Sequence, residues 1–128
     1  MKEKRKKFSL FDRLESFRYA FRGILALIRY EHNFRIHLVI LTAVILAGLF
    51  FRISVTDWLA IVFVSALVLV SESLNSSVEY LSDAVHPETD ERIRKAKDIA
   101  AGAVLIAAIT SIITGLIIFV PELVKLFG

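Results

Sequence analysis

Apolar residues of this chain gather in three long runs, and polar or charged residues mark the ends of each run. A helix that spans a bilayer needs about 20 apolar residues, and only the third run meets that length by itself. The second run continues, without Gly or Pro, into a polar stretch that ends at Asp83, so one longer helix is expected there. The pattern predicts an all-α membrane protein, with Pro121 ending the third helix. The predicted transmembrane helices cover residues 34–51, 56–84 and 97–120.

The N-terminal part has a different pattern. Residues 9–30 are predicted to form an amphipathic helix, with Ser9 and Asp12 placed as in a capping box. Its apolar residues recur at spacings of three and four: Phe11, Leu14, Phe17, Phe21, Ile24 and Ile28. Arg18 and Arg22 lie off that face, which is typical of a helix in the membrane interface. Residues 1–7 are a basic leader, either a solvated tail or a tether to anionic lipid headgroups.

Composition agrees with a membrane protein of one domain, residues 1–128. Hydrophobic residues make up 56% of the 128, too many for a soluble domain of this size to bury. The chain has no cysteine, which excludes disulfides and thiolate metal sites. No signal peptide is expected, because the basic N-terminus leads into an amphipathic segment rather than a short apolar one.

Basic residues are distributed unevenly along the chain. Ten of the sixteen Lys and Arg lie in the first 35 residues, and four more lie between Asp83 and Lys97. The opposite side of the predicted bundle has only Arg52 and Lys125. The excess predicts that the N-terminus and the second loop are cytoplasmic and that the C-terminus lies outside the plasma membrane.

The polar end of the second spanning segment is the main candidate site. Glu72, Asn75, Glu79 and Asp83 follow at spacings of +3, +4 and +4, which puts them within about 40° of one direction on a helix. Acids at membrane depth are costly and mark a working site by default. The same interface is expected to hold other polar groups, namely Glu31, Lys97 and Asp98.

Each of these residues also has a structural interpretation. The acids of the second segment could form a polar seam between helices, and Asn75 could bridge two helices. Lys97 could be a cation at a helix end that reaches for the headgroups, and Glu31 could be a solvated interface residue. The histidines, His32, His37 and His86, are expected in the headgroup region rather than as ligands.

Clustered carboxylates suggest a specific chemistry. Mg²⁺ takes one or two carboxylates while phosphates and water complete its shell, and a further carboxylate can act as general base. No Walker, Rossmann or protein-kinase motif is present, so a nucleotide has to be held by side chains and metal. Two other classes stay open: an ion- or proton-coupled transport subunit, and a non-catalytic membrane partner protein.

Longer motifs add a family resemblance. The segment from Glu72 to Asp83, ESLNSSVEYLSD, and the segment from Ala96, AKDIAAGAV, resemble the signature of the small integral-membrane diacylglycerol kinases of bacteria. Phe21-Arg-Gly and Glu31-His-Asn-Phe-Arg also match that family. The basic leader and the sequence from Glu31 to His37 are similar to the Gram-positive branch of that family, whose members mainly phosphorylate undecaprenol.

The resemblance implies a homotrimer with active sites shared between subunits, using ATP and Mg²⁺ to phosphorylate a membrane lipid alcohol. It implies undecaprenol as the substrate, with diacylglycerol as the alternative, and no nucleic-acid partner. It implies Glu72 as the general base and Glu31 and Glu79 as metal ligands. The residues that it implies near the nucleotide are Arg13, Tyr19, Glu31, Asn75, Glu79, Glu88, Asp90, Lys97 and Asp98. Asp83 matches the signature without an assigned role.

Overall fold

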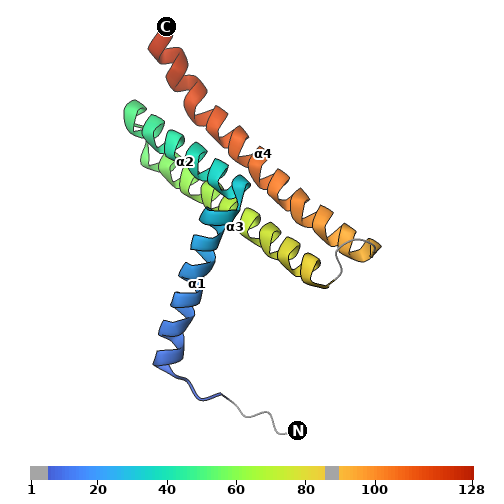
Figure 1. Cartoon of the computed structure of the whole chain (residues 1–128). Coiled ribbons are helices and arrows are strands. Elements are labelled where there is room, and N and C mark those ends of the chain that lie inside the picture. Colours follow the sequence, from blue (N-terminus) through green and yellow to red (C-terminus); the bar gives the residue numbers. More distant parts are fainter. Residues whose placement is uncertain (1–5, 86–89) are drawn as a thin grey trace.

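The computed structural model describes residues 6–85 and 90–128, and within these ranges every regular element is an α-helix. The helices are α1 (Leu10–Tyr30), α2 (His32–Phe51), α3 (Val55–Val85) and α4 (Glu91–Phe127). Figure 1 shows α2, α3 and α4 side by side, while α1 leaves this bundle at a steep angle. The three bundled helices are each long and apolar enough to cross a membrane. The predicted all-α fold with three such helices is confirmed.

Glu31 is the joint between α1 and α2. The first helix is capped by Ser9, whose hydroxyl accepts the N–H of Asp12 at 3.3 Å. Glu31 has an extended backbone (φ −100°, ψ 109°) and separates the two helices by a single residue. Its N–H donates to the Leu27 carbonyl at 3.0 Å, and its own carbonyl accepts the N–H of Arg35 at 3.2 Å. A candidate site residue therefore lies where the chain changes direction.

The turn between α2 and α3 is tight. Arg52 adopts the left-handed conformation (φ 52°), and Ser54 then caps α3 by accepting the N–H of Asp57 at 3.1 Å. Gly48 permits the close approach of the two helices, because a Cβ atom there would lie 2.6 Å from the ring of Trp58. This contact fixes α2 antiparallel to α3.

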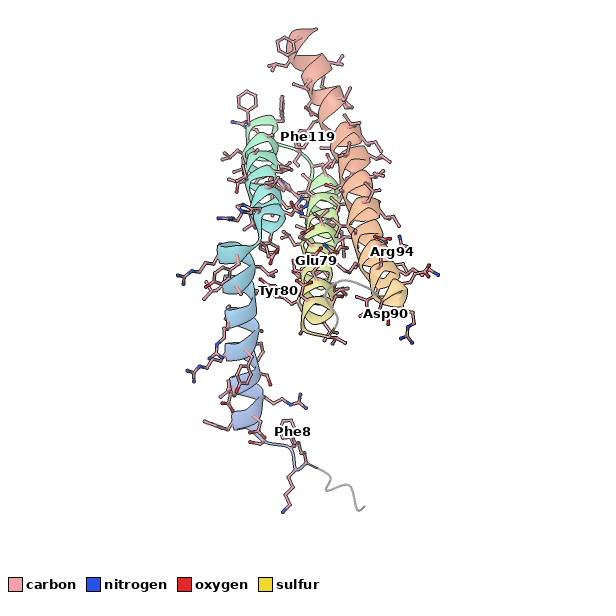
Figure 2. The ribbon with its side chains drawn as sticks, turned by 45° about the vertical axis from the view of Figure 1, so that its right-hand side comes forward. Phe8, Glu79, Tyr80, Asp90, Arg94 and Phe119 are labelled. Atoms are coloured by element: carbon pink, nitrogen blue, oxygen red, sulfur yellow. The ribbon has the colours of Figure 1, made fainter. Side chains whose placement is uncertain are left out.

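The buried apolar core lies at the same end as this turn. Ile53, Ile61 and Ile118 are buried together, and the rings of Phe51 and Phe119 lie 6.2 Å apart beside them. Figure 2 labels Phe119 at this end of the bundle. The contact of α3 with α4 is much more extensive than its contact with α2. Most other large apolar side chains of the bundle are exposed, as expected for helices that face lipid or a partner subunit.

The expected end of the last helix at Pro121 is wrong. Pro121 lies inside α4, which continues to Phe127. Proline lacks an N–H, but its φ is compatible with a helix, so the helix loses a backbone hydrogen bond without having to stop. At the other end, α4 begins before residue 97. Asp90 caps it by accepting the N–H of Arg92 at 2.8 Å.

Candidate active site

Glu72 is a buried acid in the middle of a helix. It belongs to α3, and only 2% of its surface is exposed. Ser76, one turn later, is buried as well, at 3%. A buried carboxylate is costly unless a donor or a cation faces it, so the surroundings of Glu72 decide its role.

The basic group that faces Glu72 comes from α2. His37 Nε2 lies 3.9 Å from Glu72 Oε2, and the His37 side chain is 21% exposed. Among the described residues, His37 is the basic side chain that lies within 4 Å of the Glu72 carboxylate, and the two form an ion pair when the imidazole is protonated. The sequence interpretation left His37 in the headgroup region and missed this contact. A spacing pattern within one helix could not reveal it, because the contact depends on how α2 packs against α3.

The other residues of the predicted face become more exposed toward the end of α3. Asn75 is partly buried, whereas Glu79 and Asp83 are exposed. The side-chain oxygen of Asn75 is buried and has no hydrogen-bond partner among the described residues. Along this face of α3, the buried acid Glu72 is followed by the unpaired oxygen of Asn75. The exposed carboxylates of Glu79 and Asp83 come next, and a ligand can reach them.

A groove of about 390 Å³ lies between α1 and α3. Glu31 lines it from the joint of the first two helices, and Tyr80 lines it from α3. The Tyr80 hydroxyl interacts with the Glu31 carboxylate, and Figure 2 shows Tyr80 beside the end of α1, with Glu79 next to it on α3. Ser76 also lines the groove, so the groove reaches the turn of α3 that follows Glu72.

Asp83 has a partner on the last helix. Lys97 Nζ lies 3.9 Å from Asp83 Oδ1, with side-chain exposures of 38% and 67%. This places Lys97 at the same end of the bundle as Glu79, while Asp98 is exposed on α4. The sequence left Asp83 without a role, and the structure gives it a contact with Lys97.

Two other predicted residues, Arg13 and Tyr19, do not join this group, while Asp90 lies at the start of α4. Arg13 lies over the ring of Phe8 at 5.6 Å, and Tyr19 donates to Glu15 at 3.4 Å and lies under the Arg22 guanidinium at 5.6 Å, so these contacts stay within residues 8–22. Figure 2 shows Phe8 far from the bundle. Asp90 caps α4 and pairs with Arg92 at 2.8 Å. Glu88 lies outside the described residues.

The donor set fits Mg²⁺ in part. Within residues 6–85 and 90–128, no three His, Asp or Glu side chains converge as a ready-made metal centre. However, Glu31 and Glu79 offer carboxylates, and Asn75 offers a buried, unpaired oxygen on the same end of the bundle. These are hard oxygen donors of the kind that Mg²⁺ uses together with phosphate and water. A metal that brings its own phosphates is compatible with this arrangement.

Comparison with known proteins gives a consistent result. Residues 18–119 match the family described as prokaryotic diacylglycerol kinase. An undecaprenol kinase of Bacillus subtilis is 36% identical over 109 residues, which cover 85% of this chain and 89% of that protein. A diacylglycerol kinase of Synechocystis sp. is 37% identical over 114 residues, which cover 88% of this chain and 65% of that protein. These matches confirm the resemblance found in the motifs and do not support the transport alternative.

Proposed function

Because this chain belongs to the prokaryotic diacylglycerol kinase family and is a lipid kinase, we propose that it transfers the γ-phosphate of ATP to the hydroxyl of undecaprenol. Diacylglycerol is the alternative substrate. The preference is supported by the basic leader and the sequence after Glu31, which are similar to the Gram-positive branch of the family.

The observation that carries the proposal is the buried carboxylate of Glu72 beside a groove that ends at Glu31. In the proposed reaction, Glu72 accepts the proton of the lipid hydroxyl while that oxygen attacks the γ-phosphorus of ATP. A new oxygen–phosphorus bond forms, the bond to the β-phosphate oxygen breaks, and ADP leaves. Such transfers depend mainly on positioning and charge neutralisation, and these are the tasks assigned to the remaining polar residues.

Glu31 and Glu79 would hold Mg²⁺, whose bound charge neutralises the phosphates. The unpaired oxygen of Asn75 supports a polar ligand at the same place. Lys97 would face the phosphates, because its ion pair with Asp83 already directs its ammonium toward the end of α3. Asp98, Asp90 and Glu88 belong to the proposed nucleotide side of the site.

The helix lengths support a site at the membrane surface. With 31 and 37 residues, α3 and α4 are about 46 and 55 Å long at 1.5 Å per residue. A hydrocarbon core of about 30 Å leaves part of each helix outside it. We place the ends that carry Glu79 and Lys97 at the cytoplasmic surface, where ATP is available. The amphipathic α1 would lie in that interface and let a lipid enter the groove sideways.

A homotrimer would explain the two residues that stay apart. Arg13 and Tyr19 line a polar groove of about 500 Å³ at the start of α1, whose lining carries both basic and acidic side chains, away from Glu72 of the same chain. In an assembly with shared sites, α1 of one subunit could bring them to the nucleotide of its neighbour. The exposed apolar faces of the bundle are compatible with such an assembly, because they can meet either lipid or a neighbouring subunit.

The proposed function can be tested with the purified protein in detergent micelles. Undecaprenol and diacylglycerol are supplied separately with Mg²⁺ and ATP labelled in the γ-phosphate. We expect labelled undecaprenyl phosphate at the higher rate, loss of product with a chelator, and a loss of at least about 100-fold in Glu72→Gln. Faster labelling of diacylglycerol would reverse the substrate assignment. Full activity of Glu72→Gln would remove Glu72 as the base.

A further inference from the structure

The imidazole of His37 is the basic group that faces the proposed base. Its Nε2 lies 3.9 Å from Glu72 Oε2, and the carboxylate is buried to 2% exposure. The other cation near this end, Lys97, pairs with Asp83 instead. Among the described residues, His37 is thus the one recorded basic partner of Glu72.

The surroundings of His37 favour this contact. It lines a small cavity of about 60 Å³ between α2, α3 and α4, whose other walls include Val68 and Leu69, the turn of α3 before Glu72. One side of the imidazole therefore meets mostly apolar surface, and its Nε2 lies 3.9 Å from the carboxylate. His32 on the same helix differs, because its Nδ1 lies 2.8 Å from an Arg35 nitrogen at the exposed surface.

We propose that His37 is a positioning residue for Glu72, an inference that rests on the proposed function. Its Nε2–H is donated to Glu72 Oε2 once both substrates are bound and fixes the orientation of the carboxylate toward the lipid hydroxyl. A separation of 3.9 Å exceeds a direct hydrogen bond. Catalytic contacts are often long without substrate and shorten in the reactive complex. A small rotation of either side chain closes the remaining distance.

Positioning predicts a particular kinetic effect. A base that is displaced by about 1 Å costs roughly 100-fold in rate, although substrates still bind. His37→Phe keeps a ring in the same place and removes the donor. We expect kcat to fall about 100-fold in His37→Phe, with KM for ATP and for the lipid changed less than about threefold.

Rescue separates positioning from packing. His37→Gln places an amide N–H near the position of Nε2, and we expect it to recover kcat to within about tenfold of the wild type. His37→Leu removes the donor with a different shape and serves as a second test if the Phe variant does not assemble. His32→Phe is the matched control, since it removes a histidine of α2 that does not face Glu72. All variants are assayed beside Glu72→Gln in the same micelles, after their helix content is shown to be unchanged.

The outcomes are distinct. The proposal is supported if His37→Phe and His37→Leu are slow while His37→Gln and the control His32→Phe stay active. It is overturned if His37→Phe and His37→Leu keep kcat within about threefold, if Gln is as slow as Phe, or if the loss lies in KM alone. An inactive Glu72→Gln beside active His37 variants rejects this inference but not the proposed function. A fully active Glu72→Gln would reject the base assignment itself.

Discussion

We predict that the substitution Asn75→Leu changes the stability and the activity of the protein in opposite directions. The Asn75 side-chain oxygen is buried without a partner among the described residues. Leaving a buried acceptor unsatisfied costs about 1–3 kcal/mol. Asn75→Leu keeps the shape of the side chain and removes that acceptor. Because Asn75 as a whole is only partly buried, we expect a gain near the lower limit, about 1 kcal/mol in the free energy of unfolding.

The activity of the same variant should fall. If the Asn75 oxygen is left unpaired so that it can bind the nucleotide or its metal, Asn75→Leu removes one preorganised polar contact. Losses of about 100-fold in kcat/KM are typical when such a contact is removed from a reaction that develops charge. Stability is measured without nucleotide, by titrating a denaturing detergent into micelles and following the far-ultraviolet circular dichroism. Activity is measured from the transfer of labelled phosphate.

Thr110→Val provides the matched control. It also removes a polar atom from a bundled helix, but the Thr110 hydroxyl already donates to the Ile106 carbonyl at 2.8 Å. We expect its stability to change by less than about 0.5 kcal/mol and its activity to stay the same. If Asn75→Leu were destabilised by more than about 1 kcal/mol, the Asn75 oxygen would have a structural partner, such as a neighbouring subunit. If the variant were stable and fully active, Asn75 would have no role in the site.

Two further predictions concern packing and surface charge. Gly48→Ala should lower the free energy of unfolding by about 1–2 kcal/mol, because the added Cβ would lie 2.6 Å from the ring of Trp58. In Gly115→Ala the Cβ meets nothing within 4 Å, so equal losses in the same detergent titration would show that the clash is not the cause. Asp83→Asn should change the free energy of unfolding by less than about 0.5 kcal/mol, because its ion pair with Lys97 is exposed. A loss above about 1 kcal/mol in low salt would reveal a stronger partner.

The helices could be predicted from the sequence because their signals are local. Apolar runs marked the three bundled helices, although only the third run was long enough by itself, and the Ser9 cap marked the start of α1. The end at Pro121 failed for the same reason, since a proline rule describes one backbone bond and not the whole helix. The predicted helices 9–30 and 34–51 left Glu31 between them, but with no glycine or proline at the break the sequence did not show that a single residue forms the joint.

The candidate site could be predicted only where it lies on one helix. The periodicity from Glu72 onward put its acids on one face of α3, but it could not tell which of them is buried. That depends on α2 and α4, and so do the contacts of His37 and Lys97. Arg13 and Tyr19 were expected near the nucleotide from the family resemblance alone. The fold of one chain keeps them on the outer half of α1.

The register of α3 suits the proposed reaction, in which one helix serves lipid and nucleotide at once. The first turns of α3 pack on α2 and α4 around Ile61, and the residues of this contact are apolar. Glu72 follows where the apolar cavity ends, so its carboxylate is shielded from water. Glu79 lies two turns further and is exposed, as the proposal requires of a carboxylate that meets a metal arriving with ATP. A helix rises about 10 Å between these two acids. Proton acceptance and phosphate binding can therefore occupy different depths of one face without placing two bare carboxylates side by side.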